Sequence, residues 1–226
     1  MQPKEYVFAA LRHETTSQVP WVPFAGVHAG VLCGYDAEEV LKDGDKLFQS
    51  LMEVNKLYRP CGQPVVFDLQ LEAEILGCDL VWTKDGPPSV KTHPLEENPV
   101  VPCRCTLPKA DDGRLPMVLD VMRRMKAAVG ETTALYGLIC GPFTLASHLR
   151  GNDIFMDMFD DEDYVHNLLD FCVDVAKRMC SFYIDAGMDV LAVVDPLVSQ
   201  VSAAHFEDFL SAPFTSLFDF IREKGA

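Results

Sequence analysis

The sequence predicts an α/β fold, in which helices cover a parallel sheet, and two observations predict it. Short apolar segments alternate along the chain with longer segments of helical periodicity. These apolar segments are almost uninterrupted, as in strands that are buried on both faces. We expect the strands at residues 21–26, 64–69, 133–140 and 188–194. With 226 residues, 49% of them hydrophobic, the chain is long enough to bury the core of one domain over 1–226.

The first part of the chain alternates helix and strand. Apolar residues at helical spacing predict a helix over 3–13. Asp36 is the expected N-cap of a helical segment over 36–58, which Gly44 divides into two pieces. The sequence LEAEILGCD, directly after the strand at 64–69, is expected to form a short helical turn.

A β-hairpin is expected outside the main sheet. The segments DLVWTK and PSVKTHPL alternate apolar and polar residues on the two sides of the turn Gly86-Pro87-Pro88. Residues 94–114, rich in proline and polar residues, are expected to form a loop. Cys103 and Cys105 are one residue apart, which is not the spacing of a zinc knuckle, so we interpret them as part of a loop or short strand.

The second part of the chain contains the segment LICGPFTLASHLRG, residues 138–151. It reads as the end of a buried strand, a break at Gly141-Pro142, and a helix that carries His148. Further helices are expected over 115–129, 153–159, 162–186 and 202–224, the last with Ser202 as its N-cap.

The charge balance argues against two classes of partner. The net charge is −15, whereas nucleic acids and anionic membranes attract cationic surfaces, so we expect neither as a partner. The first residues have the pattern of an amphipathic helix rather than of a secretion signal, and no apolar run approaches the ~20 residues of a membrane span. We therefore expect a cytoplasmic protein whose eight cysteines are reduced thiols.

Candidate catalytic residues follow two of the expected strands, because parallel α/β folds bind ligands at the carboxyl ends of their strands. Asp68 interrupts the apolar run VVFDL, where a carboxylate is costly unless it is hydrogen-bonded or reaches a cleft. Asp195 follows the strand at 188–194 in the same way. The alternatives are structural: Asp68 as the cap of the next turn, and Asp195 as a turn residue before proline.

Four further residues near strand ends are candidate substrate contacts: His28, Glu72, Thr144 and His148. His28, in GVHAG, could equally be a plain loop residue, and His148 a solvated helix residue. Glu72 and Glu74 would point to different faces of a helix, so they do not form an acid/base pair. The sequence has no Gly-rich phosphate loop, no G-x-S-x-G and no H-E-x-x-H. Because no cysteines pair at ligand spacing, we expect no metal site in this chain.

Three motifs, in order along nearly the whole chain, resemble the uroporphyrinogen decarboxylase superfamily. They are VVFDLQLEAEILGCDLVW with PPSVKTHPL, then GPFTLASHLRG, then YIDAGMDVLAVVDPLVSQVSAAHFEDFLSAPF. The opening PKEYVFAALRHETTSQVPWVP is similar to the start of the methyltransferase branch of that superfamily. The resemblance implies a (β/α)8 barrel of the TIM type, here incomplete, with about four βα units and an extra β-hairpin. It also implies that the Gly141-Pro142 turn forms part of the pocket wall and that His148 reaches toward the pocket.

The decarboxylase branch is matched only in part. That branch holds a tetrapyrrole polycarboxylate with an R-Q-A-G-R motif, where this sequence has VHAGV, so that Val27 and Val31 replace both arginines. Its catalytic aspartate is matched by Asp68, whereas its tyrosine is replaced by His148 and its serine by Pro196. Without those arginines, a chain of net charge −15 is a poor host for a polyanion.

The other branch consists of corrinoid-dependent methyltransferases, and the VDP that ends the last strand and the LEAE after Asp68 are closer to it. In that branch a zinc ion, held by an H-x-C motif and a distant cysteine, binds a small thiol such as coenzyme M and lowers its pKa. A corrinoid (cobalamin) protein carries the methyl group. The resemblance therefore implies zinc, a corrinoid and these partners for the full-length enzyme, with no metal ligand in this chain.

In the family, the H-x-C motif follows the strand after FIREKGA. We therefore expect this chain to be the N-terminal part of a longer protein, inactive by itself and a homodimer through the open face of its half-barrel. The leading hypothesis is a methyltransferase that moves a methyl group between a corrinoid protein and a thiol. The alternatives are a uroporphyrinogen decarboxylase of porphyrin biosynthesis and a non-catalytic half-barrel that binds a corrinoid protein or a complementary chain.

Overall fold

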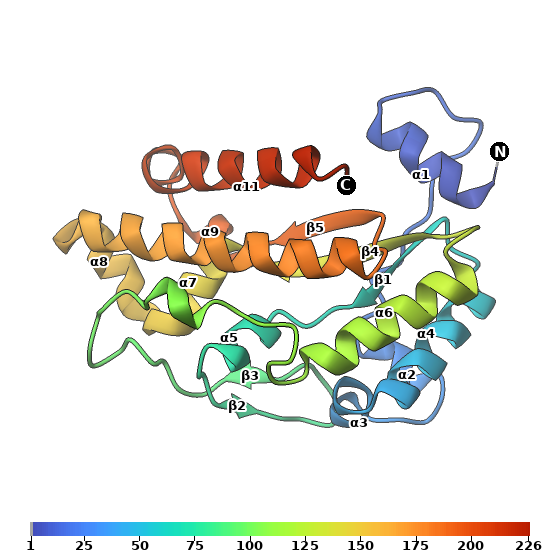
Figure 1. The fold of residues 1–226 in the computed structure, drawn as a ribbon, viewed down its shortest axis with the longest axis horizontal. Helices are drawn as coiled ribbons and strands as arrows, with labels where there is room; N and C mark the ends of the chain where they lie inside the picture. The colour runs from blue at the N-terminus through green and yellow to red at the C-terminus, as the bar shows by residue number, and fades with distance from the viewer. Residues whose placement is uncertain (1) are drawn as a thin grey trace.

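The main sheet of the protein is parallel and has three strands. The computed structural model describes residues 2–226 (Figure 1). The strands are β1 (Gly62–Val66), β4 (Ala134–Cys140) and β5 (Val190–Val194), in the order β1-β4-β5. The central strand, β4, pairs with both neighbours and is almost fully buried, which explains its unbroken apolar run. The expected α/β class and three of the four expected strands are confirmed.

The strand expected at 21–26 does not form, so that prediction is wrong. The segment lies beside the start of β1, where the carbonyl of Trp21 accepts hydrogen bonds of 2.8 and 3.3 Å from two successive amides. Pro20 and Pro23 have no N–H to donate, so a ladder of strand hydrogen bonds does not develop on this side of β1.

Four long helices build the layers around the sheet. They are α4 (Gly44–Tyr58), α6 (Leu115–Val129), α9 (Glu162–Asp185) and α11 (Ser211–Glu223). α6 packs against β1 and α9 against β4, while α4 covers α6 and α11 covers α9 (Figure 1). The core between the sheet and these helices is apolar, and Met122, Met125, Leu168 and Met179 are fully buried in it.

Seven shorter helices connect these elements. Their bounds are α1 (Pro3–Leu11), α2 (His28–Val31), α3 (Ala37–Lys42), α5 (Leu71–Ile75), α7 (Pro142–Arg150), α8 (Ile154–Asp160) and α10 (Ala203–His205). The predicted N-cap of α3 is confirmed: the Asp36 carboxylate accepts from the amide of Glu39 at 2.9 Å, and the Asp36 amide donates to the Glu39 carboxylate at 3.0 Å. Ser202 caps α10 in the same way, accepting from the amide of His205 at 3.1 Å.

The helix expected over 202–224 is not continuous. A π-helical turn, Phe206–Leu210, separates α10 from α11. Such a turn inserts an extra residue into the helical repeat and re-aims the side chains that follow it. The periodicity of the sequence does not mark this interruption.

The hairpin expected outside the main sheet is confirmed. Its strands, β2 (Leu80–Val81) and β3 (Ser89–Val90), are antiparallel and form a sheet of their own. Trp82 follows β2 directly and makes two cation–π contacts. The Lys42 ammonium lies 4.0 Å and the Arg114 guanidinium 4.9 Å from the centroid of its ring. The hairpin is thereby attached to α3 and to the start of α6.

A partly buried ion cluster fixes the start of β5. The Asp189 carboxylate lies 2.8 Å from the ammonium of Lys4 on α1 and 2.6 Å from that of Lys126 on α6. Its second oxygen accepts a 2.9 Å hydrogen bond from the amide of Leu135 on β4. One carboxylate therefore joins α1, α6 and two strands at the amino end of the sheet.

Candidate functional site

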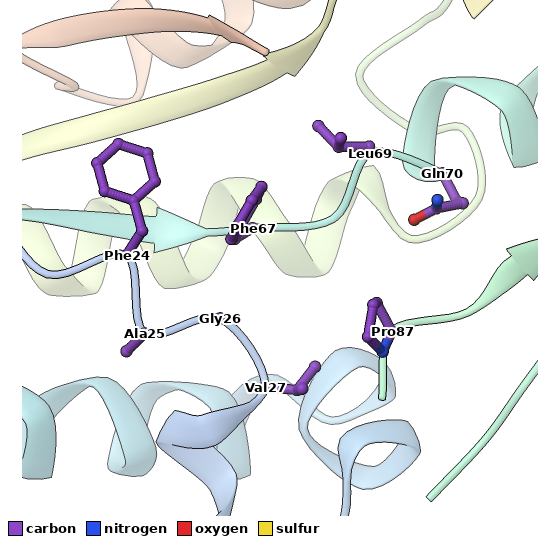
Figure 2. A pocket seen from close by; sticks show the side chains of 8 residues that line it. All are labelled: Phe24, Ala25, Gly26, Val27, Phe67, Leu69, Gln70 and Pro87. Carbon is purple, nitrogen blue, oxygen red and sulfur yellow. The ribbon is translucent and has the colours of Figure 1, made fainter. Parts of the chain in front are cut away.

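A cavity of about 280 Å³ lies at the carboxyl end of β1 (Figure 2). Residues from three segments line it: Phe24, Ala25, Gly26, Val27, Phe67, Leu69, Gln70 and Pro87. Gln70 supplies the polar side chain of this lining, and the other walls are apolar. The rings of Phe24 and Phe67 meet edge to face at 5.9 Å. The cavity therefore suits an apolar group with a single polar handle.

Gly26 makes the turn that brings Val27 to the cavity. Its φ of +53° lies in the left-handed region, where a side chain is strained. A Cβ atom at this position would also lie 3.4 Å from Cδ1 of Phe67. The segment before α2 can therefore lie close to the end of β1 because this residue is glycine.

Asp68 turns away from the cavity into a buried ion network. Its side chain has no exposed area, and one of its oxygens lies 2.7 Å from Nη1 of Arg114. The other oxygen accepts a 3.0 Å hydrogen bond from the amide of Gln70. Nε of Arg114 donates to Glu74 at 2.7 Å, so two carboxylates share one guanidinium. Asp68 is both the cap of the next turn, as the structural alternative expected, and a buried anion next to the cavity.

Glu72, on α5, is buried among apolar side chains with 1% of its surface exposed. One oxygen accepts a 3.1 Å hydrogen bond from the amide of Cys140 at the end of β4, and the other has no hydrogen-bond partner among residues 2–226. The pKa of this carboxyl is raised to about 7, mainly by burial and also by the charge of Asp68, while the hydrogen bond from the Cys140 amide lowers it. Glu72 therefore changes its protonation near neutral pH.

His148 lies on α7 with its ring partly buried. The pKa of the imidazole is lowered to about 4, mainly by burial and also by the charge of His93, while the charge of Asp68 opposes both effects. Nδ1 of His148 and Nη2 of Arg114 are buried without hydrogen-bond partners in the described part of the chain. The charge of Asp68 acts on both Glu72 and His148, so these buried polar groups lie close enough to influence one another.

Asp195 and Thr144 form a second, separate arrangement. The Asp195 carboxylate accepts hydrogen bonds from the amides of Phe143 (2.9 Å) and Thr144 (3.0 Å) and from the Thr144 hydroxyl (2.5 Å). A Cβ atom on Gly141 would lie 2.2 Å from Cβ of Asp195, so the end of β5 packs directly on the first turn of α7. Burial raises the pKa of Asp195, while these hydrogen bonds lower it. Its carboxylate is occupied in holding α7.

His28 lies near neither the Asp68 network nor the Asp195–Thr144 arrangement. It lies on α2 with an exposed side chain, and its Nε2 is 2.9 Å from the hydroxyl of Tyr58. Tyr58 ends the helix that leads into the start of β1, so this contact lies toward the amino ends of the strands. The residues that line the cavity also do not include the Gly141-Pro142 turn, which the resemblance placed in the pocket wall.

Arg114 is the site residue that the sequence analysis missed. It stands directly before α6, at the end of a long polar loop, and no spacing in the sequence relates it to Asp68. The sequence does indicate that Asp68 has a partner, because a carboxylate at the apolar end of a strand requires a cation or several hydrogen-bond donors. That requirement does not say which of the chain's Lys and Arg residues supplies the cation.

Within residues 2–226, no group of three or more His, Cys, Asp or Glu side chains could hold a metal ion. The donor set of a zinc site is thus not provided by these residues alone. None of the helices in the described range is long and apolar enough to cross a membrane.

A comparison with protein families identifies the chain. The family model described as uroporphyrinogen decarboxylase (URO-D) matches residues 2–226. The chain belongs to the uroporphyrinogen decarboxylase family. Its expected relation to this superfamily is therefore confirmed.

Relatives in this family have two kinds of name. A methylcobamide:CoM methyltransferase MtbA from Methanosarcina acetivorans is 27% identical over 221 residues, 94% of this chain and 64% of the relative. A methylcobamide:CoM methyltransferase MtaA from Methanosarcina barkeri is 30% identical over 151 residues, 64% of this chain and 43% of the relative. A uroporphyrinogen decarboxylase from Prochlorococcus marinus is 22% identical over 186 residues, 79% of this chain and 52% of the relative.

A solved structure shares the fold. A methyltransferase from Methanosarcina mazei superposes with a TM-score of 0.87 at 23% sequence identity, over 98% of this chain and 67% of the other. The URO-D chain spans 64% of the length of the MtbA relative, so its three-stranded sheet matches part of a larger fold.

Proposed function

We propose that this chain forms one side of the substrate pocket of a corrinoid-dependent methyltransferase, which moves a methyl group between a corrinoid protein and a small thiol such as coenzyme M. The similarity to methylcobamide:CoM methyltransferases of the URO-D family supports this proposal. So does the α/β fold, which is shared with a solved methyltransferase. On this proposal the strands of a (β/α)8 barrel are completed by sequence that residues 2–226 do not contain.

The observation that carries the proposal is the apolar cavity beside Val27 (Figure 2). A tetrapyrrole polycarboxylate would require cations in this wall, and Val27 stands where the decarboxylase motif has an arginine. The nearby Arg114 does not substitute for it, because Asp68 and Glu74 already neutralise its charge. A wall of this kind is better suited to a small substrate with an uncharged reacting end than to a polyanion.

The residues of the chain position and shield such a substrate. The Arg114–Asp68 pair holds the turn after β1, so that Phe67, Leu69 and Gln70 present their side chains to the cavity. Asp195 and Thr144 fix the first turn of α7, which carries His148 toward Asp68. Asp68 and Asp195 act as positioning residues on this proposal, and Glu72, whose pKa is about 7, is available to bind or release a proton.

The name of the MtbA relative implies a corrinoid for the whole enzyme, and the resemblance to the methyltransferase branch implies zinc. When bound, the corrinoid supplies the methyl-transfer chemistry and zinc acidifies the acceptor thiol. Because residues 2–226 do not provide a zinc donor set, we assign no step to the metal. Likewise, the homodimer and the cytoplasmic location remain predictions.

One observation favours a decarboxylase as the second candidate. Asp68 matches the aspartate of that branch and lies buried beside the cavity at the end of β1. The absence of arginine from the VHAGV segment argues against this candidate.

The test compares the two reactions directly. The complete gene product is assayed for methyl transfer from methylcobalamin to coenzyme M, with added zinc, and separately for loss of carboxyl groups from uroporphyrinogen. We expect thiol methylation, a large loss of it in Asp68→Asn, and no decarboxylation. Decarboxylation without methyl transfer would replace the proposal with the second candidate. Neither activity, together with binding of a corrinoid protein, would favour a non-catalytic binding half-barrel.

A further inference from the structure

Cys103 and Cys105 are the two exposed cysteines of the chain. Cys33 is half-buried, and the other five cysteines are buried, namely Cys61, Cys78, Cys140, Cys172 and Cys180. Burial raises the pKa of the Cys78 and Cys180 thiols to about 12, so these groups stay protonated and unreactive. Thiol chemistry at the surface is therefore concentrated in the loop between β3 and α6.

The loop holds the two exposed thiols against each other. Arg104–Thr106 form a single 3-10 turn that Cys103 precedes. The amide of Cys105 donates to Sγ of Cys103 at 3.2 Å, and the amide and hydroxyl of Thr106 donate to the Cys103 carbonyl at 2.9 and 2.8 Å. The turn therefore holds the Cys103 sulfur against the backbone of Cys105.

The turn is also attached to the body of the protein. Arg104, which lies between the cysteines, forms an ion pair with Asp174 on α9. Pro108 follows the turn and is buried. Because the backbone is ordered by these contacts and by Thr106, the two thiols stay close without a further loss of chain entropy.

The two thiols differ in acidity in a way that suits sequential reaction. Hydrogen bonding from the Cys105 thiol and amide lowers the pKa of Cys103, whereas donating that bond raises the pKa of Cys105. Thiol–disulfide exchange needs one sulfur to attack as a thiolate and a neighbouring sulfur to complete the reaction. Cys103 suits the first role and Cys105 the second.

We propose that Cys103 and Cys105 form a redox-active surface dithiol, which closes into a disulfide within the loop by exchange with a low-molecular-weight disulfide. The Cys103 thiolate attacks one sulfur of that disulfide, forms a mixed disulfide and releases one thiolate. The Cys105 thiol then loses its proton to solvent, and its sulfur attacks the sulfur of Cys103 and displaces the second thiolate. The external disulfide is reduced to two thiols, and the protein dithiol loses two electrons.

The structure also indicates that this disulfide would be reversible. Only one residue separates the two cysteines, so bond formation must distort the 3-10 turn and its hydrogen bonds. Exposed and strained disulfides have the more oxidising potentials and are reduced readily. Closure would also move Arg104, so the ion pair to Asp174 connects the oxidation state of the loop to α9.

The test uses the purified full-length protein, reduced with a phosphine that is then removed and exposed to oxidised glutathione. Peptide mass mapping is expected to show the 103–105 peptide lighter by the mass of two hydrogens, without a glutathione adduct, and dithiothreitol is expected to reverse the change. Cys103→Ser and Cys105→Ser each retain one thiol, so each should keep a stable glutathione adduct. Cys105→Ser, which retains Cys103, should form its adduct faster.

Cys33→Ser is the matched control and should close the loop disulfide like the wild type. Three results would overturn the proposal: a lasting adduct on wild-type Cys103 or Cys105, a disulfide between two molecules, or both thiols remaining reduced while Cys33 reacts. Because both residues are exposed, replacement by serine should leave the circular dichroism spectrum unchanged. A changed spectrum would mean that the altered reaction with glutathione comes from altered folding, and it would overturn the assignment of Cys103 and Cys105 as a dithiol.

Discussion

Replacement of Arg114 by methionine removes the cation of the buried Asp68 while keeping most of the aliphatic length of the side chain. The Asp68 side chain has no exposed area and that of Arg114 has 12%, so water does not take over the lost interaction. Removing one partner of a buried ion pair costs about 3–5 kcal/mol, because the remaining charge stays desolvated. For a chain of this size, each kcal/mol lowers the melting temperature by roughly 2–4 °C.

The assay is urea unfolding, followed by circular dichroism, of the wild type, Arg114→Met, Asp68→Asn and the double variant. Asp68→Asn removes the charge that Arg114→Met leaves without a partner. The loss in the free energy of unfolding caused by Arg114→Met should therefore be smaller in the Asp68→Asn variant than in the wild type, by at least about 2 kcal/mol. Arg124→Met is the matched control. Its partner Asp45 has 88% of its side chain exposed, so the free energy of unfolding should fall by less than about 1 kcal/mol. Equal losses in both arginine variants, or additive losses in the double variant, would refute this reasoning.

Two further predictions concern the buried carboxylate of Glu72 and the partly buried carboxylate of Asp195. Because burial raises the pKa of Glu72 from 4.5 to about 7, folding takes up a proton between these values, and this contribution to stability is lost as the pH rises through that range. Glu72→Gln should therefore gain stability relative to the wild type, by up to about 3 kcal/mol between pH 4.5 and 7; a difference that is constant with pH contradicts the prediction. Asp195→Ala removes three hydrogen bonds to the first turn of α7 and should cost about 2 kcal/mol, against about 1 kcal/mol for the cap variant Asp36→Ala. Thermal unfolding measures both losses, and an equal effect of the two aspartates would argue that Asp195 acts only as an ordinary cap.

Much of the fold is predictable because its signals are local. The helix at 115–129 has the predicted bounds, and Asp36 and Ser202 are N-caps as predicted, since periodicity and capping depend on residues within one or two turns. The segment at 21–26 has an apolar strand pattern, but strand formation also needs free amides, and its prolines remove them.

The site is predictable only in part, because its contacts join residues far apart in sequence. The unusual position of Asp68 in an apolar run identifies it, whereas Arg114 is selected by the route of a long loop that no pattern encodes. Asp195 follows its strand as predicted, but its hydrogen bonds to α7 depend on the pairing of β4 with β5. His28 occupies an expected position in the sequence, yet a short helix turns its ring toward Tyr58.

The two ends of β5 are fixed by carboxylates, and this has a mechanical consequence. At its start Asp189 binds Lys4, Lys126 and the amide of Leu135, and at its end Asp195 binds the first turn of α7. A strand anchored in this way cannot slide along β4, since a slip of one residue would break both anchors and invert its faces. The cavity wall contributed by Gly26, Val27 and Pro87 belongs to a loop and a hairpin outside the main sheet. This part of the cavity wall is therefore held by contacts other than the hydrogen bonds of the main sheet, whose end strand β5 is fixed at both of its ends.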